Sequence, residues 1–467
     1  MSAFEESLQR VIARHSRRAI SKRTSSSISP DPAIAIGIAT IKIVTEEHIQ
    51  AVAFGSFDTA PQVVERLDPI GRDVTDLLPF AHFLNGVADR ALQTGTPMRI
   101  WVPHEVTLEA LDVLGHRYAN NQSATDEIRR MGQICRIIAH EARIPGQQLV
   151  ANAAALLKDH CVTGLAPIEE GHLDAILAWL DPAVSDPLTE ARNRIRLPAS
   201  GILPNTPDHP IDDRVDRLRK EAKAASGTRR HTLEGEIRSI LSQWVTREWA
   251  LLTMGRRGFQ SLGLPASGLD DLVSVSWKRV EHDLQNGFYP ARAPHRLVIE
   301  LSTLEASKDK ADIVALENDP TLREQASRAG GVVHGNVVQV DQQRPKFNPC
   351  HIHVESDQNV IRLRQDDKVK VVGSSVKGVV RRIRSTATGG TRISIEITSG
   401  VRQTAVLRTG VHLELLRDAF GFVNLKALSE ANVRQPWIFY GNAPPSIAST
   451  LPLSGSALAI ARSVRHT

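Results

Sequence analysis

The sequence predicts a multidomain protein with an α/β region, an all-α middle and a small all-β module. Apolar residues alternate with a period of two in residues 33–57 and again after residue 331, and this period is typical of strands. Between these stretches the apolar residues recur at helical spacing. At 467 residues the chain is also too long for one typical core. Because domains usually span roughly 100 to 200 residues, we expect about three of them.

The N-terminal segment, residues 1–32, is predicted to be a basic amphipathic helix followed by a linker. Arginines occupy the face of the helix opposite its apolar residues. The apolar residues at helical spacing are Phe4, Leu8, Val11 and Ile12. Two interpretations stay open: the helix docks its apolar stripe on the same protein, or it contacts phosphates, lipid or a partner. Residues 22–32 are rich in Ser and contain Pro, which is typical of a linker.

Residues 33–187 are predicted to form the α/β domain. Its strands are expected at residues 33–44, 49–57 and 98–102, and its helices at residues 76–92, 106–118, 126–143 and 173–180. Ser123 and Asp126 have the spacing of a capping box at the start of the third helix. The Pro- and Asp-rich stretch of residues 181–210 then indicates a domain boundary.

Residues 188–330 are predicted to be a helical domain. Helices are expected at residues 214–225, 232–256, 270–285 and 320–329, where apolar residues line one face. Trp244 and Trp249 fall on the broad apolar face of the second of these helices. We expect both indole rings to be part of the core and not to stack on a ligand.

Residues 331–420 are predicted to form a small β-barrel of OB-like or related type. Strands are expected at residues 332–340, 351–355, 368–372, 376–384 and 392–398. Gly389 and Gly390 lie in the turn between the last two and indicate a hairpin. Several short strands with frequent turns are typical of a small barrel. A C-terminal extension, residues 421–467, follows.

The predicted barrel has a larger excess of positive charge than the protein as a whole. Residues 331–417 contain fourteen Lys and Arg against seven Asp and Glu, an excess of seven, whereas the whole chain has a formal charge of +5. Such side chains bind nucleic-acid phosphates with a salt-sensitive, sequence-independent affinity. The candidate nucleic-acid-binding residues are Arg362, Arg364, Lys368, Lys370, Lys377, Arg381, Arg382, Arg384 and Arg392.

Within that set, residues 379–384 read Val-Val-Arg-Arg-Ile-Arg. Strand alternation predicts Arg382 and Arg384 on one face and Arg381 on the other. One such face could follow a phosphate backbone. The alternative is an edge strand whose charges prevent aggregation.

The sequence predicts neither a metal site nor a cofactor. His351 and His353 share one face of a strand, with Cys350 beside them, but zinc needs three or four ligands and no second cluster supplies the rest. The motifs GxxxxGK[ST], GxSxG, HExxH and CxxC are all absent. An enzyme is therefore the less favoured class.

Cysteine content and hydropathy indicate a cytoplasmic protein without a membrane segment. Cys135, Cys161 and Cys350 are widely spaced and odd in number, unlike a disulfide framework, and this fits a reducing compartment. No apolar run reaches the length of a transmembrane helix, and the N-terminus has charges where a signal peptide needs an apolar stretch.

The order of strands and helices in residues 33–118 resembles an RNase H-like nuclease. In such enzymes carboxylates near the first strand hold two metal ions for phosphodiester cleavage. Here the first strand, residues 33–44, contains no carboxylate. The resemblance therefore implies a degenerate, inactive domain.

Several stretches together resemble the region that precedes the ATPase core in prokaryotic superfamily-one helicases associated with a RecB-like nuclease. Residues 98–118 (MRIWVPHEVTLEALDVLGHRY) resemble the strand and helix of its RNase H-like part. Residues 243–283 resemble its helical middle through Trp244, Trp249 and Trp277, and residues 330–373 resemble its β-barrel segment. The resemblance covers residues 33–445 in order, but no helicase core is present in this sequence.

This resemblance implies a non-catalytic accessory subunit. We expect it to bind DNA or RNA through the barrel and to dock a separate helicase, ATPase or nuclease subunit through the helical middle, in DNA repair or phage defence. One alternative is a divergent metal-dependent nuclease that uses Glu105, Asp112 and Asp174. A second alternative is an assembly scaffold that binds acidic protein surfaces.

Overall fold

The computed structural model describes residues 3–22, 25–43, 48–71, 74–288, 294–341, 350–386, 389–403 and 405–418. The chain divides into one compact unit of residues 1–290 and 303–421 and a second of residues 291–302 and 422–467. The predicted extension, residues 421–467, lies outside the described residues. Of the second unit, only the start of one helix is therefore described.

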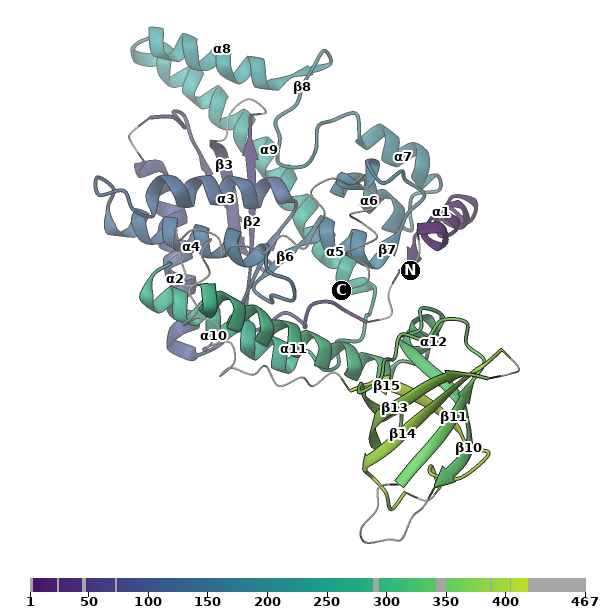
Figure 1. Ribbon diagram of the computed structural model, residues 1–467. Helices are drawn as coiled ribbons and strands as arrows, with labels where there is room; N and C mark the ends of the chain where they lie inside the picture. The colour runs from purple at the N-terminus through teal and green to yellow at the C-terminus, as the bar shows by residue number, and fades with distance from the viewer. Residues whose placement is uncertain are drawn as a thin grey trace, which may run out of the picture. The chain divides into compact units, whose positions relative to one another are not determined.

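A mixed five-stranded sheet forms the centre of the α/β region (Figure 1). In spatial order its strands are β4 (Gln62–Glu65), β3 (Ile49–Ser56), β2 (Ile34–Lys42), β5 (Met98–Val102) and β6 (Val150–Asn152). β2 pairs antiparallel with β3 and parallel with β5, which in turn pairs parallel with β6. The predicted β2, β3 and β5 are confirmed. β4 and β6 are not predicted, because β4 has two adjacent valines that interrupt the alternation and β6 has only three residues.

Large apolar side chains fill the core on one face of this sheet. They include Ile36, Ile38 and Phe54, and they pack against four helices. These helices are α2 (Leu78–Thr94), α3 (Glu105–Tyr118), α4 (Asp126–Ala142) and α10 (Asp270–Asn286). The first three confirm the predicted helices. The N-cap of α4, however, is Thr125, whose hydroxyl accepts a hydrogen bond from the Ile128 amide at 3.5 Å.

Small residues on the opposite face of the sheet let α9 (Gly227–Ser261) lie close against β2 and β3 (Figure 1). A Cβ atom added at Gly37 would lie 2.8 Å from a ring carbon of Trp249. Trp249 is buried at 7% exposure and Trp244 packs beside this core, as predicted. α5 (Ala153–His160), α6 (Leu173–Leu180) and α8 (Ile211–Ala224) contribute to the same core, and α7 (Pro187–Arg194) packs on α6. The core thus continues across residue 187, where the sequence predicts a domain boundary; the division into domains stays a prediction.

Residues 26–32, predicted as part of a linker, are held against the sheet. Ile28 is buried in the core with α9. The Asp31 carboxylate accepts hydrogen bonds from Trp101 Nε1 and Arg256 Nε, both at 2.8 Å. Arg99, 1% exposed, donates to the Ser29 hydroxyl at 2.8 Å. This segment is therefore fixed by polar contacts that composition does not reveal.

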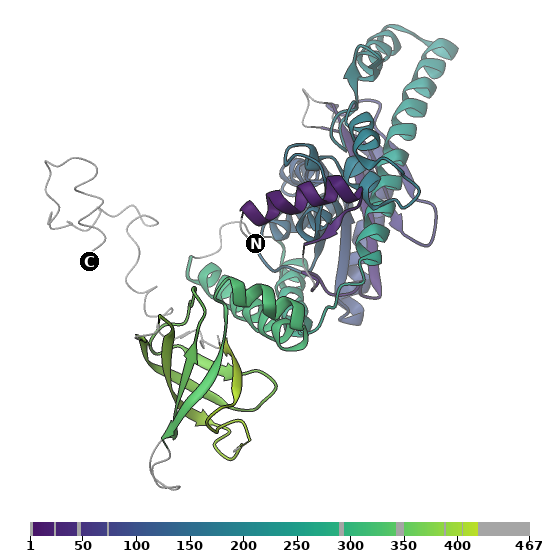
Figure 2. The same ribbon diagram turned by 90° about the vertical axis from the view of Figure 1, so that its right-hand side faces the viewer.

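Six antiparallel strands close into a barrel (Figure 2). They run in the order β10 (Val332–Asp341), β11 (Cys350–Ser356), β14 (Thr391–Ser399), β13 (Lys377–Ser385), β12 (Lys368–Val371) and β15 (His412–Arg417). Their inward side chains, mainly Val and Ile, form a separate core. The predicted barrel, its first five strands and the β13–β14 hairpin are confirmed. β15 escaped prediction because Leu415 and Leu416 are adjacent and interrupt the period of two.

Two helices precede the barrel. α11 (Pro294–Asn318) is not predicted from the sequence, because its apolar residues do not gather on one face of the helix. The predicted α12 (Pro320–Arg328) is confirmed. α12 packs on β10, and Ile313 at the end of α11 shares a small cluster with Val332 and Leu416. No helix among the described residues combines the length and the apolarity needed to cross a membrane.

Candidate nucleic-acid interface

Arg381, Arg382 and Arg384 all lie on the outer surface of the barrel. A β-bulge in β13 makes Val380 pair with Ile395, while Arg382 pairs with the next residue, Ser394. All three arginines are exposed. The prediction that Arg381 faces away from Arg382 and Arg384 is therefore wrong, because a bulge inserts one residue and resets the alternation.

The turn before β12 is fixed against this bulge. The Asp366 amide donates to the Val380 carbonyl at 2.7 Å, and the Val380 amide donates to the Asp367 carbonyl at 2.9 Å. Asp366 has a φ of 67°, in the left-handed region that lets the chain reverse sharply. These contacts bring Arg364 next to the bulge. Lys368 then starts β12 opposite Val379.

Four of the nine candidate cations are paired with carboxylates. Arg381 bonds Glu396 at 2.5 Å and Asp366 at 3.1 Å, and the hydrogen bond with Glu396 is the main cause that raises the pKa of Arg381. The other three pairs are Arg392 with Glu355 at 2.6 Å, Lys377 with Asp418 at 2.9 Å, and Lys370 with Glu317. The positive charge of these four side chains is therefore largely neutralised.

The other five candidates are exposed, and no carboxylate of the described barrel lies within ion-pair distance of them. They are Arg362, Arg364, Lys368, Arg382 and Arg384. Arg362 lies apart from the other four, since its amide donates to the carbonyl of Gly330, just before β10. We call the remaining four, Arg364, Lys368, Arg382 and Arg384, the bulge cluster. Backbone pairing places them on β12, on β13 and in the turn fixed to β13.

The two candidate metal ligands lie on the outer face of β11, as the alternation predicts. His353 bonds Ser394 through Nδ1 at 2.8 Å and Asp341 through Nε2 at 3.1 Å. His351 stands in register with Asp341 on one side and Glu396 on the other. In the part of the chain that the structure describes, no three His, Cys, Asp or Glu side chains are placed to hold a metal ion. Cys350 points into the barrel core.

The carboxylates of the nuclease alternative are not brought together as a metal site. Asp112 pairs with Arg143 at 2.9 Å, and Asp174 pairs with Arg194 at 3.0 Å and with Arg247 at 2.7 Å. Glu105 accepts a hydrogen bond from the Asn152 amide group at 3.4 Å. Arginines thus occupy two of the three carboxylates that a metal ion would need as ligands.

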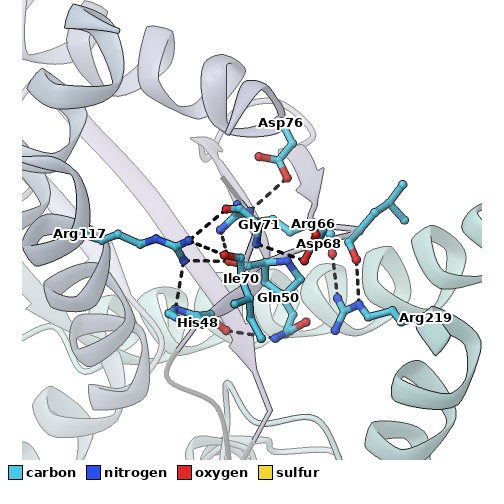
Figure 3. A network of polar contacts seen from close by, with 11 residues as sticks. His48, Gln50, Arg66, Asp68, Ile70, Gly71, Asp76, Arg117 and Arg219 are labelled. Carbon is cyan, nitrogen blue, oxygen red and sulfur yellow. Dashed lines mark hydrogen bonds and ion pairs between the residues drawn. The ribbon is translucent and has the colours of Figure 1, made fainter. Parts of the chain in front are cut away.

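Arginines of the α/β region have a different environment, shown in Figure 3. Arg66 is 1% exposed, bonds Asp76 at 3.1 Å and donates to the Pro69 carbonyl at 3.1 Å. Arg117 donates to the carbonyls of Pro69, Ile70 and Gly71 at 2.8–3.1 Å. Arg219 donates to two further carbonyls of the same segment. These three side chains fix the residues after β4 and are not available to a polyanion.

Helix α1 (Ala3–Ser16) also turns its arginines inward. Arg10 donates to the Leu165 carbonyl at 2.6 Å, and Arg14 donates to the Gly164 carbonyl at 2.5 Å. Ala13 between them is fully buried. The docked face of α1 is therefore its arginine face.

Three residues of the apolar stripe of α1 are left exposed, and the side chain of the fourth, Phe4, lies outside the described part of the chain. Leu8, Val11 and Ile12 are 51%, 61% and 48% exposed. Of the two interpretations of this helix, docking of the apolar stripe on the same protein is wrong for these residues. Hydrogen bonds from guanidinium groups to backbone carbonyls, which periodicity cannot show, decide which face docks.

Every member of the bulge cluster is among the candidate cations of the sequence, but composition does not distinguish these four from the paired cations. Strand register and the bulge decide which carboxylates reach which arginines, and neither can be inferred from local composition.

No protein-family model, no curated protein and no solved structure matches this chain at a significant level.

Proposed function

We propose that this protein is a non-catalytic nucleic-acid-binding accessory subunit that docks a separate helicase, ATPase or nuclease. The observation that carries the proposal is the bulge cluster, four exposed cations without a described carboxylate partner on one side of a closed barrel. When exposed cations of this kind contact phosphates, they release counterions that were bound to the polyanion, and this release favours binding. Because the barrel is closed, β13 has no free edge, so protection of an edge strand does not account for these charges.

The α/β region supports the RNase H-like part of the proposal. Its sheet order, β4-β3-β2-β5-β6 with β3 antiparallel to both neighbours, agrees with that fold. β2 carries no carboxylate, and arginines hold Asp112 and Asp174. We therefore assign this domain a structural role.

The exposed apolar stripe of α1 supports a protein partner. The apolar face of α9 is covered by the sheet, so the helical middle offers less apolar surface than the sequence suggests. Leu8, Val11 and Ile12 are the alternative contact, and clustered exposed apolar side chains mark protein interaction sites. A role in DNA repair or phage defence follows from the helicase resemblance alone.

Two measurements test this function. Fluorescence anisotropy of the full chain with labelled DNA and RNA at low salt tests binding, and affinity purification from its native host followed by an ATPase and nuclease assay tests docking. We expect nucleic-acid binding in the first measurement and a co-purified enzyme in the second. The co-purified enzyme should be lost in Leu8→Ser/Val11→Ser but kept in the control Ile168→Ser, which changes another exposed apolar residue. Absence of both binding and a co-purified enzyme contradicts the proposal.

A scaffold or a nuclease would give other results. Binding of an acidic protein that is indifferent to added DNA would favour a scaffold. Metal-dependent cleavage that disappears in Glu105→Gln would favour the nuclease alternative.

A further inference from the structure

We infer that the barrel binds the phosphate backbone of a double-stranded nucleic acid and does not bind single strands by base stacking. This inference rests on the proposed function and names the substrate class of the same site. It depends on three features of the barrel: the scarcity of Phe, Tyr and Trp, the polar side chains on the outer strand face, and the placement of the unpaired cations.

The barrel has almost no aromatic side chain on which a base could stack. Residues 331–418 contain one Phe and no Tyr or Trp. The single ring, Phe347, lies outside the described residues. Barrels that bind single strands rely on aromatic stacking, worth about 1–3 kcal/mol per base.

Histidine rings do not replace this platform. His353 has both ring nitrogens hydrogen-bonded and its side chain is 21% exposed. His334 and His412 face each other at 5.9 Å, bonded to Ser327 and Asn336 respectively. These three rings are therefore held by neighbouring side chains, and the remaining ring, His351, is only partly exposed between Asp341 and Glu396.

Polar groups in register fill the outer face of the strands around β14. One row across the sheet contains Arg382, Ser394 and His353, and the next contains Arg384, Arg392 and Glu355. Such rows offer hydrogen-bond donors and charge but no flat apolar surface. Contacts to phosphates suit them, whereas contacts to base faces do not.

The bulge cluster forms a short stripe of fixed charge. Arg382 and Arg384 are two residues apart on one strand, which corresponds to about 7 Å at a strand rise of about 3.4 Å per residue. The turn that carries Arg364 is held by two backbone hydrogen bonds to Val380. The backbone positions from which these side chains extend are therefore fixed before a polyanion binds.

A site that contacts only phosphates favours the polymer of higher charge density. Each contact releases about 0.9 counterion from duplex DNA and about 0.7 from a single strand. Four contacts then predict slopes of log affinity against log salt near −3.6 for the duplex and −2.8 for the single strand. Without stacking, nothing in the described part of the barrel compensates the single strand for this difference.

The test compares a labelled DNA duplex, the matching RNA duplex and each separate strand by anisotropy across a salt series, with the full-length protein. At low salt we expect either duplex or both to bind about tenfold or more tightly than the single strands. Duplexes of unrelated sequence should bind equally. A DNA-only or RNA-only preference then identifies which duplex the protein uses.

The outcomes separate this inference from the proposed function. Single strands that bind as tightly as duplexes, or a strong preference for one base composition, overturn the inference and leave the accessory function standing. Loss of duplex binding in Arg382→Ala/Arg384→Ala, with an unchanged circular dichroism spectrum, supports both. Failure of every nucleic acid to bind at low salt overturns both.

Discussion

Three arginines of the α/β region and the unpaired arginines of the barrel have opposite environments. Arg66, Arg117 and Arg219 donate to backbone carbonyls and hold one segment in place (Figure 3). Arg382 and Arg384 reach outward from β13 without a described carboxylate partner. The difference teaches that a count of charges does not measure the charge available to a ligand. Only the second kind can contribute to phosphate binding.

Arg66→Met tests the structural side of this comparison and has the largest expected effect on stability. The change removes the buried guanidinium that donates to the Pro69 carbonyl and to the Asp76 carboxylate. We expect the free energy of unfolding to fall by about 3 kcal/mol. Tryptophan fluorescence in urea reports this region, because five of the six Trp lie at positions 101–277 and none in the barrel.

The matched control for Arg66→Met is Arg382→Met. Its side chain is exposed, so we expect a change in stability within about 0.5 kcal/mol. If Arg66→Met is as stable as this control, the loop-holding role of the α/β arginines is wrong.

Glu248 extends the comparison to carboxylates. It is 3% exposed, and desolvation raises its pKa to about 7 although the Ser200 hydroxyl and the Gly201 amide bond it. Because the folded pKa exceeds the unfolded value of 4.5, the folded state binds the extra proton. Its contribution to stability therefore decreases as pH rises from about 4.5 to 7, by about 3 kcal/mol at most.

Glu248→Gln should remove that pH dependence. We expect the difference in unfolding free energy between variant and parent to grow in favour of the variant from pH 5 to pH 7.5, measured by urea unfolding at both. Glu236→Gln, on the exposed face of the same helix, serves as the control and should follow the parent. A parallel pH profile for Glu248→Gln would contradict the assignment.

Arg364→Ala and Lys368→Ala test smaller contributions at the edge of the bulge cluster. Each should weaken duplex binding roughly fivefold at moderate salt, because each removes one phosphate contact. Lys370→Ala is the matched control, since Lys370 is paired with Glu317 and should contribute less. Competition anisotropy at one fixed salt concentration measures all three. Equal losses in the three variants would mean that pairing does not determine availability.

The fold could be predicted from the sequence where periodicity is long. β2, β3, β5 and five of the barrel strands have runs of alternating residues, and they were found. Short strands such as β6, and β15 with its adjacent leucines, could not be. The docked face of α1 could not be predicted for another reason. Long-range hydrogen bonds from Arg10 and Arg14 fix the arginine face against the protein, although the apolar stripe lies on the other face.

The candidate interface was predictable as a set of residues but not as an arrangement. The nine cations stand out by composition alone. The bulge after Val380 and the left-handed Asp366 depend on pairing between strands far apart in sequence. These two features, and not residue type, separate Arg381 from Arg382.

The salt dependence of duplex binding in two double variants tests the central claim most directly. In Arg382→Ala/Arg384→Ala the slope of log affinity against log salt should become shallower by about 1.8, which corresponds to two lost phosphate contacts. In Arg381→Ala/Arg392→Ala, whose side chains bond Glu396 and Glu355, it should stay close to that of the parent. Equal changes in the two variants would contradict the claim that unpaired cations of the barrel form the interface.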